Sequence, residues 1–71
     1  MININLEKFN ELIKNDSLTL SGFAKKLGVS RTQVWRVFNF KSQPGAEFIA
    51  KFKKAYPNKD LDEYFFNDSV A

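Results

Sequence analysis

The chain has 71 residues, 44% of them hydrophobic, which supplies the core of one small domain and no more. It contains no cysteine and no histidine, so disulfide bonds, zinc ribbons, thiol chemistry and the usual general base are excluded. The formal net charge is +3, but Glu47 is the only acidic residue between positions 17 and 54, where most of the 11 basic residues lie. Such a basic centre favours a polyanion as partner.

No segment of the sequence has the character of a membrane span or a secretion signal. A membrane span needs about 20 consecutive apolar residues. Residues Met1–Leu6 lack the basic start and the long apolar stretch of a signal. We therefore expect a soluble protein of the cytoplasm, with no membrane partner.

The first predicted helix runs from Leu6 to about Lys14, with Asn5 as its N-cap. Its apolar residues recur at helical spacing and form one stripe: Leu6, Phe9, Leu12 and Ile13. The preceding Ile2 and Ile4 alternate with asparagine, which indicates a short extended arm. Residues 15–17 break the helical pattern and form a connection.

Two short helices are expected next. Thr19 is a good N-cap for a helix over about Leu20–Lys26, and Gly28 can take the left-handed conformation that ends it. Ser30 then opens a third helix, because Ser30-x-x-Gln33 has the spacing of a capping box. We expect Asn39 to end this helix in a left-handed conformation.

The last part of the chain predicts two more helices. Pro44 suits the first turn of a fourth helix, which must end before Pro57. Asp60-x-x-Glu63 has capping-box spacing before a short fifth helix. The fold is thus expected to be all-α, with five helices packed around a core that we predict to contain Leu6, Phe9, Phe23, Leu27, Val34, Val37, Ile49 and Phe52.

The residues between Leu20 and Asn39 form the most informative pattern. A small residue, Ala24, allows two helices to approach, and Gly28 can turn the chain between them. Val29 would fill the corner, and Val34 and Val37 would fix the later helix onto the earlier one. A generic helical bundle with a glycine between two helices is the plain alternative, but it does not explain this combined spacing.

This pattern resembles the helix-turn-helix of the phage repressor and Cro family, and the resemblance extends from Thr19 to Phe65. It implies a five-helix, lambda-repressor-like DNA-binding domain that comprises residues 1–71, with the helix-turn-helix at about residues 20–39. In size and in the character of this motif, the chain is also similar to the small modulator-of-repression proteins of temperate phages. Those proteins act partly by binding the lysogeny repressor.

The resemblance implies that the third helix enters the major groove of DNA. Its outward positions are expected at Ser30, Arg31, Thr32, Trp35, Arg36 and Asn39. Arg31 and Arg36 are suited to bidentate contacts with guanine, and Thr32 to a thymine methyl group. Contacts to DNA phosphates are expected from Lys25, Lys26 and Lys41, although each is equally well explained as a solvated surface charge.

Three residues depart from the family pattern, the first being Leu20, which stands where a glutamine usually contacts the DNA backbone at the start of the second helix. Phe38 stands where the family usually has a charged residue, and Phe40 where glycine commonly ends the third helix. Both can be core residues beneath the fourth helix, which we favour for Phe38. Trp35 follows the inward-facing Val34 and is expected to point outward. An exposed tryptophan between arginines is typical of a protein-binding hot spot, so the residues assigned to a protein partner are Arg31, Trp35, Arg36 and Phe40.

Two functional hypotheses follow. The leading one is a transcriptional regulator of a phage or mobile-element switch in a bacterial host cell, which binds double-stranded operator DNA. The alternative is an antirepressor that binds a partner repressor with the same surface. We expect no enzymatic activity, cofactor, metal or small-molecule substrate, because nucleophile–base pairs, phosphate loops and catalytic carboxylate pairs are missing. Near the end, Phe65 would close the core, and Phe66 is the better candidate for a contact in a homodimer.

Overall fold

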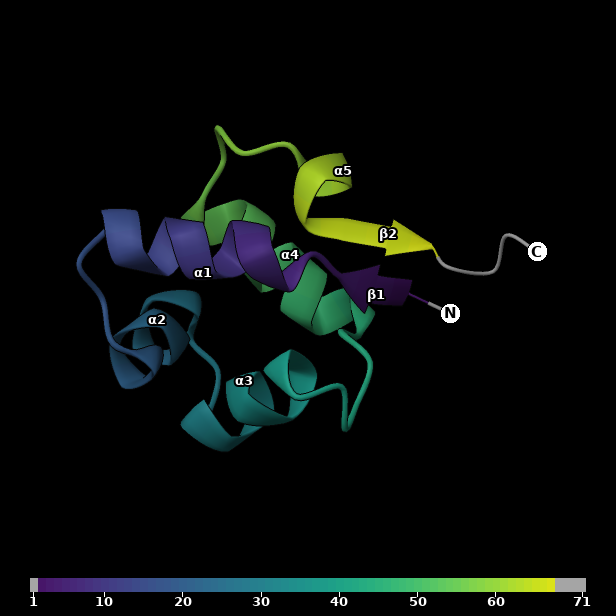
Figure 1. Ribbon diagram of the computed structural model, residues 1–71, viewed down its shortest axis with the longest axis horizontal. Coiled ribbons are helices and arrows are strands. Elements are labelled where there is room, and N and C mark those ends of the chain that lie inside the picture. Colours follow the sequence, from purple (N-terminus) through teal and green to yellow (C-terminus); the bar gives the residue numbers. More distant parts are fainter. Residues whose placement is uncertain (1, 68–71) are drawn as a thin grey trace.

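Side-chain caps and apolar spacing divide the chain into short elements, which the computed structural model describes for residues 2–67. Within this range the protein is mostly helical, with a small two-stranded sheet (Figure 1). The elements are β1 (Ile2–Ile4), α1 (Leu6–Asn15), α2 (Leu20–Leu27), α3 (Arg31–Phe38), α4 (Ala46–Ala55), α5 (Leu61–Tyr64) and β2 (Phe65–Asn67). None of the helices in residues 2–67 combines the length and apolar character needed to cross a bilayer.

Three helices begin at the capping residues predicted from the sequence. The Asn5 side chain accepts a hydrogen bond from the Lys8 amide at 3.2 Å, and Thr19 caps α2 through the Gly22 amide at 3.0 Å. Ser30 accepts from the Gln33 amide at 3.0 Å, as its capping-box spacing predicts. Each cap satisfies a backbone donor that the first helical turn leaves free.

The first three helices end in the same hydrogen-bonded turn, the Schellman motif. Its left-handed residue is Ser17 after α1, Gly28 after α2 and Phe40 after α3, with φ angles of 54°, 80° and 58°. After α3, the Phe40 amide donates to the Val37 carbonyl and the Lys41 amide to the Arg36 carbonyl. The prediction that Asn39 is left-handed is therefore wrong, since Asn39 has a φ of −101°. The strained position falls on the next residue.

Two expectations about the later helices need correction. Helix α4 begins at Ala46 with Gly45 as its N-cap, so Pro44 precedes the first turn instead of forming it. Pro44 is buried in the connection from α3, where a rigid apolar ring can pack. Asp60 does cap α5, but its side chain accepts from the Asp62 amide at 3.0 Å and not from the amide of Glu63.

The two strands pair with each other in antiparallel fashion, in a register that sets Asn3 opposite Phe66 and Ile4 opposite Phe65. Figure 1 shows this sheet beside α5, with the first and last described elements side by side. The sequence predicts the extended arm at Ile2 and Ile4 but not its partner strand. Ile4 and Phe65 are both buried, so the sheet closes one end of the core, as expected for Phe65.

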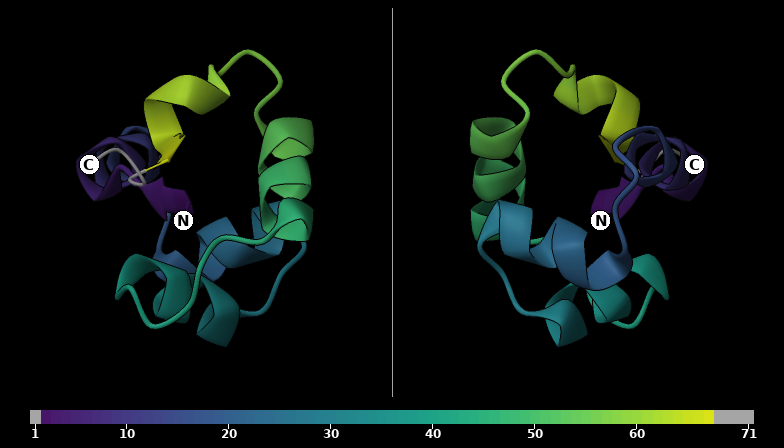
Figure 2. Two further views of the ribbon diagram at one scale, coloured as in Figure 1. Left: turned by 90° about the vertical axis from the view of Figure 1, so that its right-hand side faces the viewer. Right: turned by 90° about the vertical axis from the view of Figure 1, so that its left-hand side faces the viewer.

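The core consists largely of aromatic rings around Phe9. This ring is fully buried and lies within 5.2–6.1 Å, centroid to centroid, of the rings of Phe23, Phe38, Phe52, Tyr64 and Phe65. The helices surround this interior, with α3 at one outer edge and α5 at the opposite one (Figure 2). Of the predicted core residues, Leu6 and Ile49 are only partly buried. On α4 the inward position belongs to Phe48, one residue before Ile49.

Candidate nucleic-acid interface

Helix α3 has one buried and one exposed face. Val34, Val37 and Phe38 are buried, and they fix the helix to the rest of the domain. The predicted outward residues are all exposed: Ser30, Arg31, Thr32, Trp35, Arg36 and Asn39. The Trp35 side chain is 48% exposed, so it points away from the core as its position after Val34 predicts. The exposed face therefore combines two guanidinium groups with an indole ring.

The arginines of this face are free to bind a ligand. Within residues 2–67, the acidic side chains that form ion pairs, Asp16, Glu47 and Glu63, pair with lysines, and none pairs with Arg31 or Arg36. Arg31, Thr32 and Trp35 line a shallow surface hollow. Because guanidinium groups carry five fixed donors, two unpaired ones on one helix face suit an anionic or acceptor-rich partner.

Two other predicted site residues are partly engaged within the protein. Asn39 donates from its side-chain amide to the Trp35 carbonyl at 2.8 Å, which adds a second hydrogen bond to a carbonyl that already accepts the Asn39 backbone amide. The Ser30 hydroxyl oxygen caps the N-terminus of the same helix. Both residues thus hold the ends of α3, and their remaining donors are available at the surface.

The three predicted lysines differ in their surroundings. Lys25 and Lys41 are exposed, and no acid of the described part pairs with either. The Lys26 ammonium instead lies 3.3 Å from the Asp16 carboxylate and 4.2 Å from the centre of the Tyr56 ring. Lys26 is therefore already paired within the fold, which favours its role as a structural cation over a phosphate contact.

Asp16, Lys26 and Tyr56 form a polar cluster that joins the α1–α2 turn to the end of α4. The Tyr56 hydroxyl donates to the Asp16 carboxylate at 2.9 Å. This hydrogen bond, followed by the one from Lys26, lowers the pKa of Asp16. Burial, and then the same hydrogen bond, raise the pKa of Tyr56. The cluster holds α2 in place behind α3 without reaching the exposed α3 face.

Sequence reasoning did not identify a second group of lysines. Lys51 and Lys54 of α4 line a hollow together with Lys25, Lys26 and Gly28. The Lys51 ammonium lies 3.0 Å from the Glu47 carboxylate and donates to the Gly28 carbonyl at 3.1 Å. The three-residue spacing of Lys51 and Lys54 puts both on one face of α4. Only the packing of α4 against α2 brings them near Lys25.

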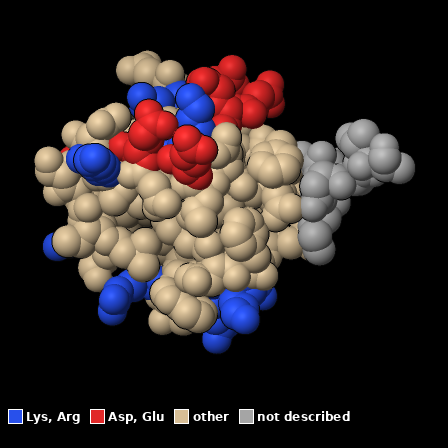
Figure 3. Space-filling view, in the orientation of Figure 1, with Lys and Arg blue, Asp and Glu red and all other residues tan. Residues whose placement is uncertain are grey.

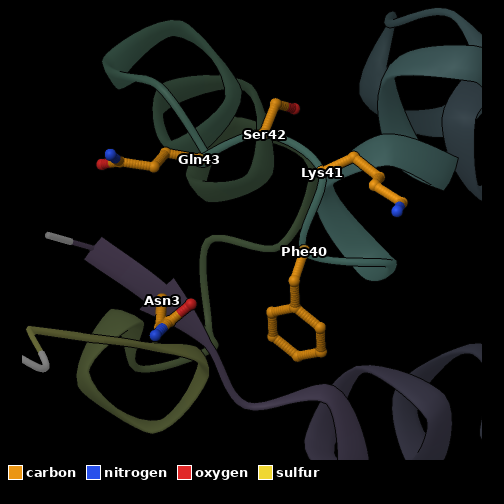
Figure 4. Close-up of a pocket in the computed structure, with 5 residues that line it drawn as sticks. All are labelled: Asn3, Phe40, Lys41, Ser42 and Gln43. Atoms are coloured by element: carbon orange, nitrogen blue, oxygen red, sulfur yellow. The ribbon is translucent and has the colours of Figure 1, made fainter.

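Of the two phenylalanines that follow Trp35, one is buried and the other is exposed. Phe38 is buried, with its ring 5.4 Å from that of Phe9 and 5.9 Å from that of Phe23. It is a core residue, as favoured from the sequence. Phe40 is 59% exposed and borders a hollow with Asn3, Lys41, Ser42 and Gln43. In Figure 4 its ring points toward the segment that joins β1 to α1, while Lys41 points to the other side.

On the face seen in Figure 3, the surface charge is polarised across the long axis of the molecule. Figure 3 shows Lys and Arg side chains along the edge where α3 lies. Asp and Glu side chains gather toward the opposite edge, over α1 and α5, where some basic side chains also lie. The uneven charge of the sequence therefore becomes a spatial separation, with α3 on the basic side.

Comparisons of the chain with protein-family models, with curated proteins and with solved structures found no match. The described residues contain no group of three or more His, Cys, Asp or Glu side chains that could hold a metal ion. Proposals about function therefore rest on the α3 face and its surroundings.

Proposed function

We propose that this protein is a helix-turn-helix regulator of transcription that binds double-stranded operator DNA through α3. The observation that carries the proposal is the exposed α3 face, where Arg31 and Arg36 have no acidic partner within residues 2–67. Gly28, with a φ of 80°, turns the chain between α2 and α3, and buried Val34 and Val37 anchor the second helix of the motif. The proposed setting is a phage or mobile-element switch in the cytoplasm of a bacterial host.

In this proposal the α3 face reads bases while flanking lysines contact phosphates. Arg31 and Arg36 donate to the guanine edge in the major groove, and Thr32 contacts a thymine methyl or a polar base edge. Of the three predicted lysines, Lys25 and Lys41, the latter on the connection after α3, have no acidic partner within residues 2–67 and are suited to phosphate contacts. The proposal requires no cofactor, metal or catalytic step.

A selection of duplexes from a random-sequence DNA library tests this function. We expect one sequence to be enriched and its affinity to fall linearly with the logarithm of salt concentration. Arg36→Ala should relax the preference at one base pair, whereas Lys41→Ala should weaken all duplexes alike and reduce the salt slope. If neither the selected pool nor a random duplex binds at low salt, the DNA-binding proposal is refuted.

A second candidate function, an antirepressor, is favoured by the exposed aromatic residues near the α3 face. Trp35 is 48% and Phe40 is 59% exposed, and duplex DNA offers an indole little beyond a thymine methyl. A partner repressor could bury the same ring, with its carboxylates paired to Arg31 and Arg36. The proposed interface comprises Arg31, Trp35, Arg36 and Phe40.

Trp35→Ala separates the two candidate functions. For an antirepressor, the substitution should weaken binding to the partner repressor by about tenfold or more and leave DNA binding nearly unchanged. The only tryptophan of the chain should also shift its emission to the blue when the repressor is added. Unchanged emission in a complex detected by sedimentation would remove Trp35 from that interface.

A further inference from the structure

An apolar groove lies at the end of the molecule where the sheet, α4 and α5 meet. Its lining residues are Ile2, Ile49, Leu61, Phe65 and Phe66, with Asp62 as the charged residue among them, and its volume is about 300 Å³. Ile2 is 37% and Phe66 is 48% exposed. Large apolar side chains that stay exposed together in a concave site are typical of an interaction surface.

The α3 face has the complementary properties. Trp35 is a protruding apolar ring, and Arg31 beside it has no acidic partner in residues 2–67. The groove is instead an open apolar depression with one acidic residue, Asp62, in its lining. No residue of α3 lines the groove, and Trp35 points away from the core, so the two surfaces of one molecule face different directions.

We propose that the groove of one copy of this chain receives Trp35 of a second copy, with Arg31 of that copy next to Asp62. Charge complementarity selects this occupant, because the basic α3 edge of one molecule meets the acidic α5 edge of the next (Figure 3). Burying the indole supplies the apolar contact area, and the desolvated ion pair fixes its orientation.

This contact joins two different surfaces, so it is a head-to-tail interface. Each added copy leaves one free groove and one free Trp35, and the assembly therefore grows with concentration unless it closes into a ring. This contact also regulates access to the α3 face, a role that rests on the proposed function. A copy whose α3 face is held in a neighbour's groove cannot present that face to DNA or to a repressor, so DNA and self-association compete.

Sedimentation of the full chain without DNA, over a range of concentrations, tests the contact. We expect wild-type mass to rise beyond that of a dimer, and Trp35 emission to shift to the blue as it does. Trp35→Ala should weaken assembly at least about tenfold, and so should the groove variant Phe66→Ser/Asp62→Lys. An equimolar mixture of the two variants should form a heterodimer that grows no further, because it retains one intact groove and one intact Trp35.

The controls make the inference refutable. Asn10→Ala removes an exposed, uncharged side chain of α1 that belongs to neither surface, so it should assemble like the wild type. A wild-type chain that stays monomeric, or a variant mixture that does not form the heterodimer although both variants are folded by circular dichroism, would overturn the inference. The sedimentation experiment contains no DNA, so its outcome does not depend on the proposed function. A chain that stays monomeric but binds DNA in the separate binding assay refutes this inference alone. A chain that assembles but binds no DNA at any dilution refutes only the proposed function.

Discussion

Replacing Gly28 by alanine isolates the backbone strain at the turn between α2 and α3. Gly28 has a φ of 80°, and a Cβ atom added to it would meet nothing within 4 Å. The change therefore introduces no clash and removes no packing. What remains is the unfavourable left-handed conformation of a residue that carries a side chain.

The expected magnitude follows from two opposing terms. A left-handed alanine costs about 1–2 kcal/mol, and the more restricted unfolded chain returns about 0.4–1 kcal/mol. Gly28→Ala should thus lower the free energy of unfolding by about 1 kcal/mol, which for a domain of this size lowers the melting temperature by roughly 4–8 °C.

Urea unfolding followed by circular dichroism measures the change, and Gly22→Ala is the matched control in the same helix. Gly22 lies inside α2, where its added Cβ would stand 3.4 Å from both the flexible end of the Leu18 side chain and the capping Thr19 hydroxyl oxygen, which is ordinary contact. There, alanine should stabilise the helix by about 0.5–1 kcal/mol. If Gly28→Ala stabilises the protein as Gly22→Ala does, the turn does not have a positive φ. A loss above about 3 kcal/mol would mean that the new methyl group collides with a neighbour.

Two further predictions concern stability, and a third concerns salt. Ala24 is 2% exposed, so Ala24→Leu should overpack the interior and cost about 1–3 kcal/mol; an unchanged melting temperature would mean that α2 is not closely packed there. The pKa of Asp16 is lowered by Tyr56 and then by Lys26, so its contribution to stability is present above the ordinary carboxyl pKa of about 3.9 and is lost as pH falls through the folded-state value. The difference in urea midpoint between wild type and Asp16→Asn should shrink in that acid range, and a constant difference would exclude the linkage. Lys26→Ala should reduce the salt slope of DNA binding less than Lys25→Ala, because Lys26 is paired with Asp16; equal slopes would count against that assignment.

The sequence predicts the starts of helices well because N-capping depends on local chemistry. Asn5, Thr19 and Ser30 each lie within three residues of the amide that they accept from, so their function needs no tertiary information. The outward direction of Trp35 is predictable for a related reason, since it follows from helical geometry once Val34 is placed inside.

Features that depend on distant partners are not accessible in this way. The pairing of Lys26 with Asp16 and Tyr56 requires the packing of α4 against the α1–α2 turn. One local feature is also missed, because residue preferences assign the left-handed conformation to Asn39 although Phe40 adopts it. The hydrogen bonds from Phe40 and Lys41 to the end of α3 override that preference. The partner of β1 is likewise hidden, because a three-residue strand carries too little pattern to identify it.

The pairing of β1 with β2 has a consequence for the order of folding. The helices form from contacts between near neighbours, whereas this sheet must close a loop of about 60 residues, at an entropic cost near 3–4 kcal/mol. So expensive a closure is favourable only after the helices have condensed and shortened the distance between the strands. Substitutions that weaken the sheet should therefore accelerate unfolding and leave the folding rate almost unchanged. The residence time of the native state would then depend on a ribbon of three residues on each side.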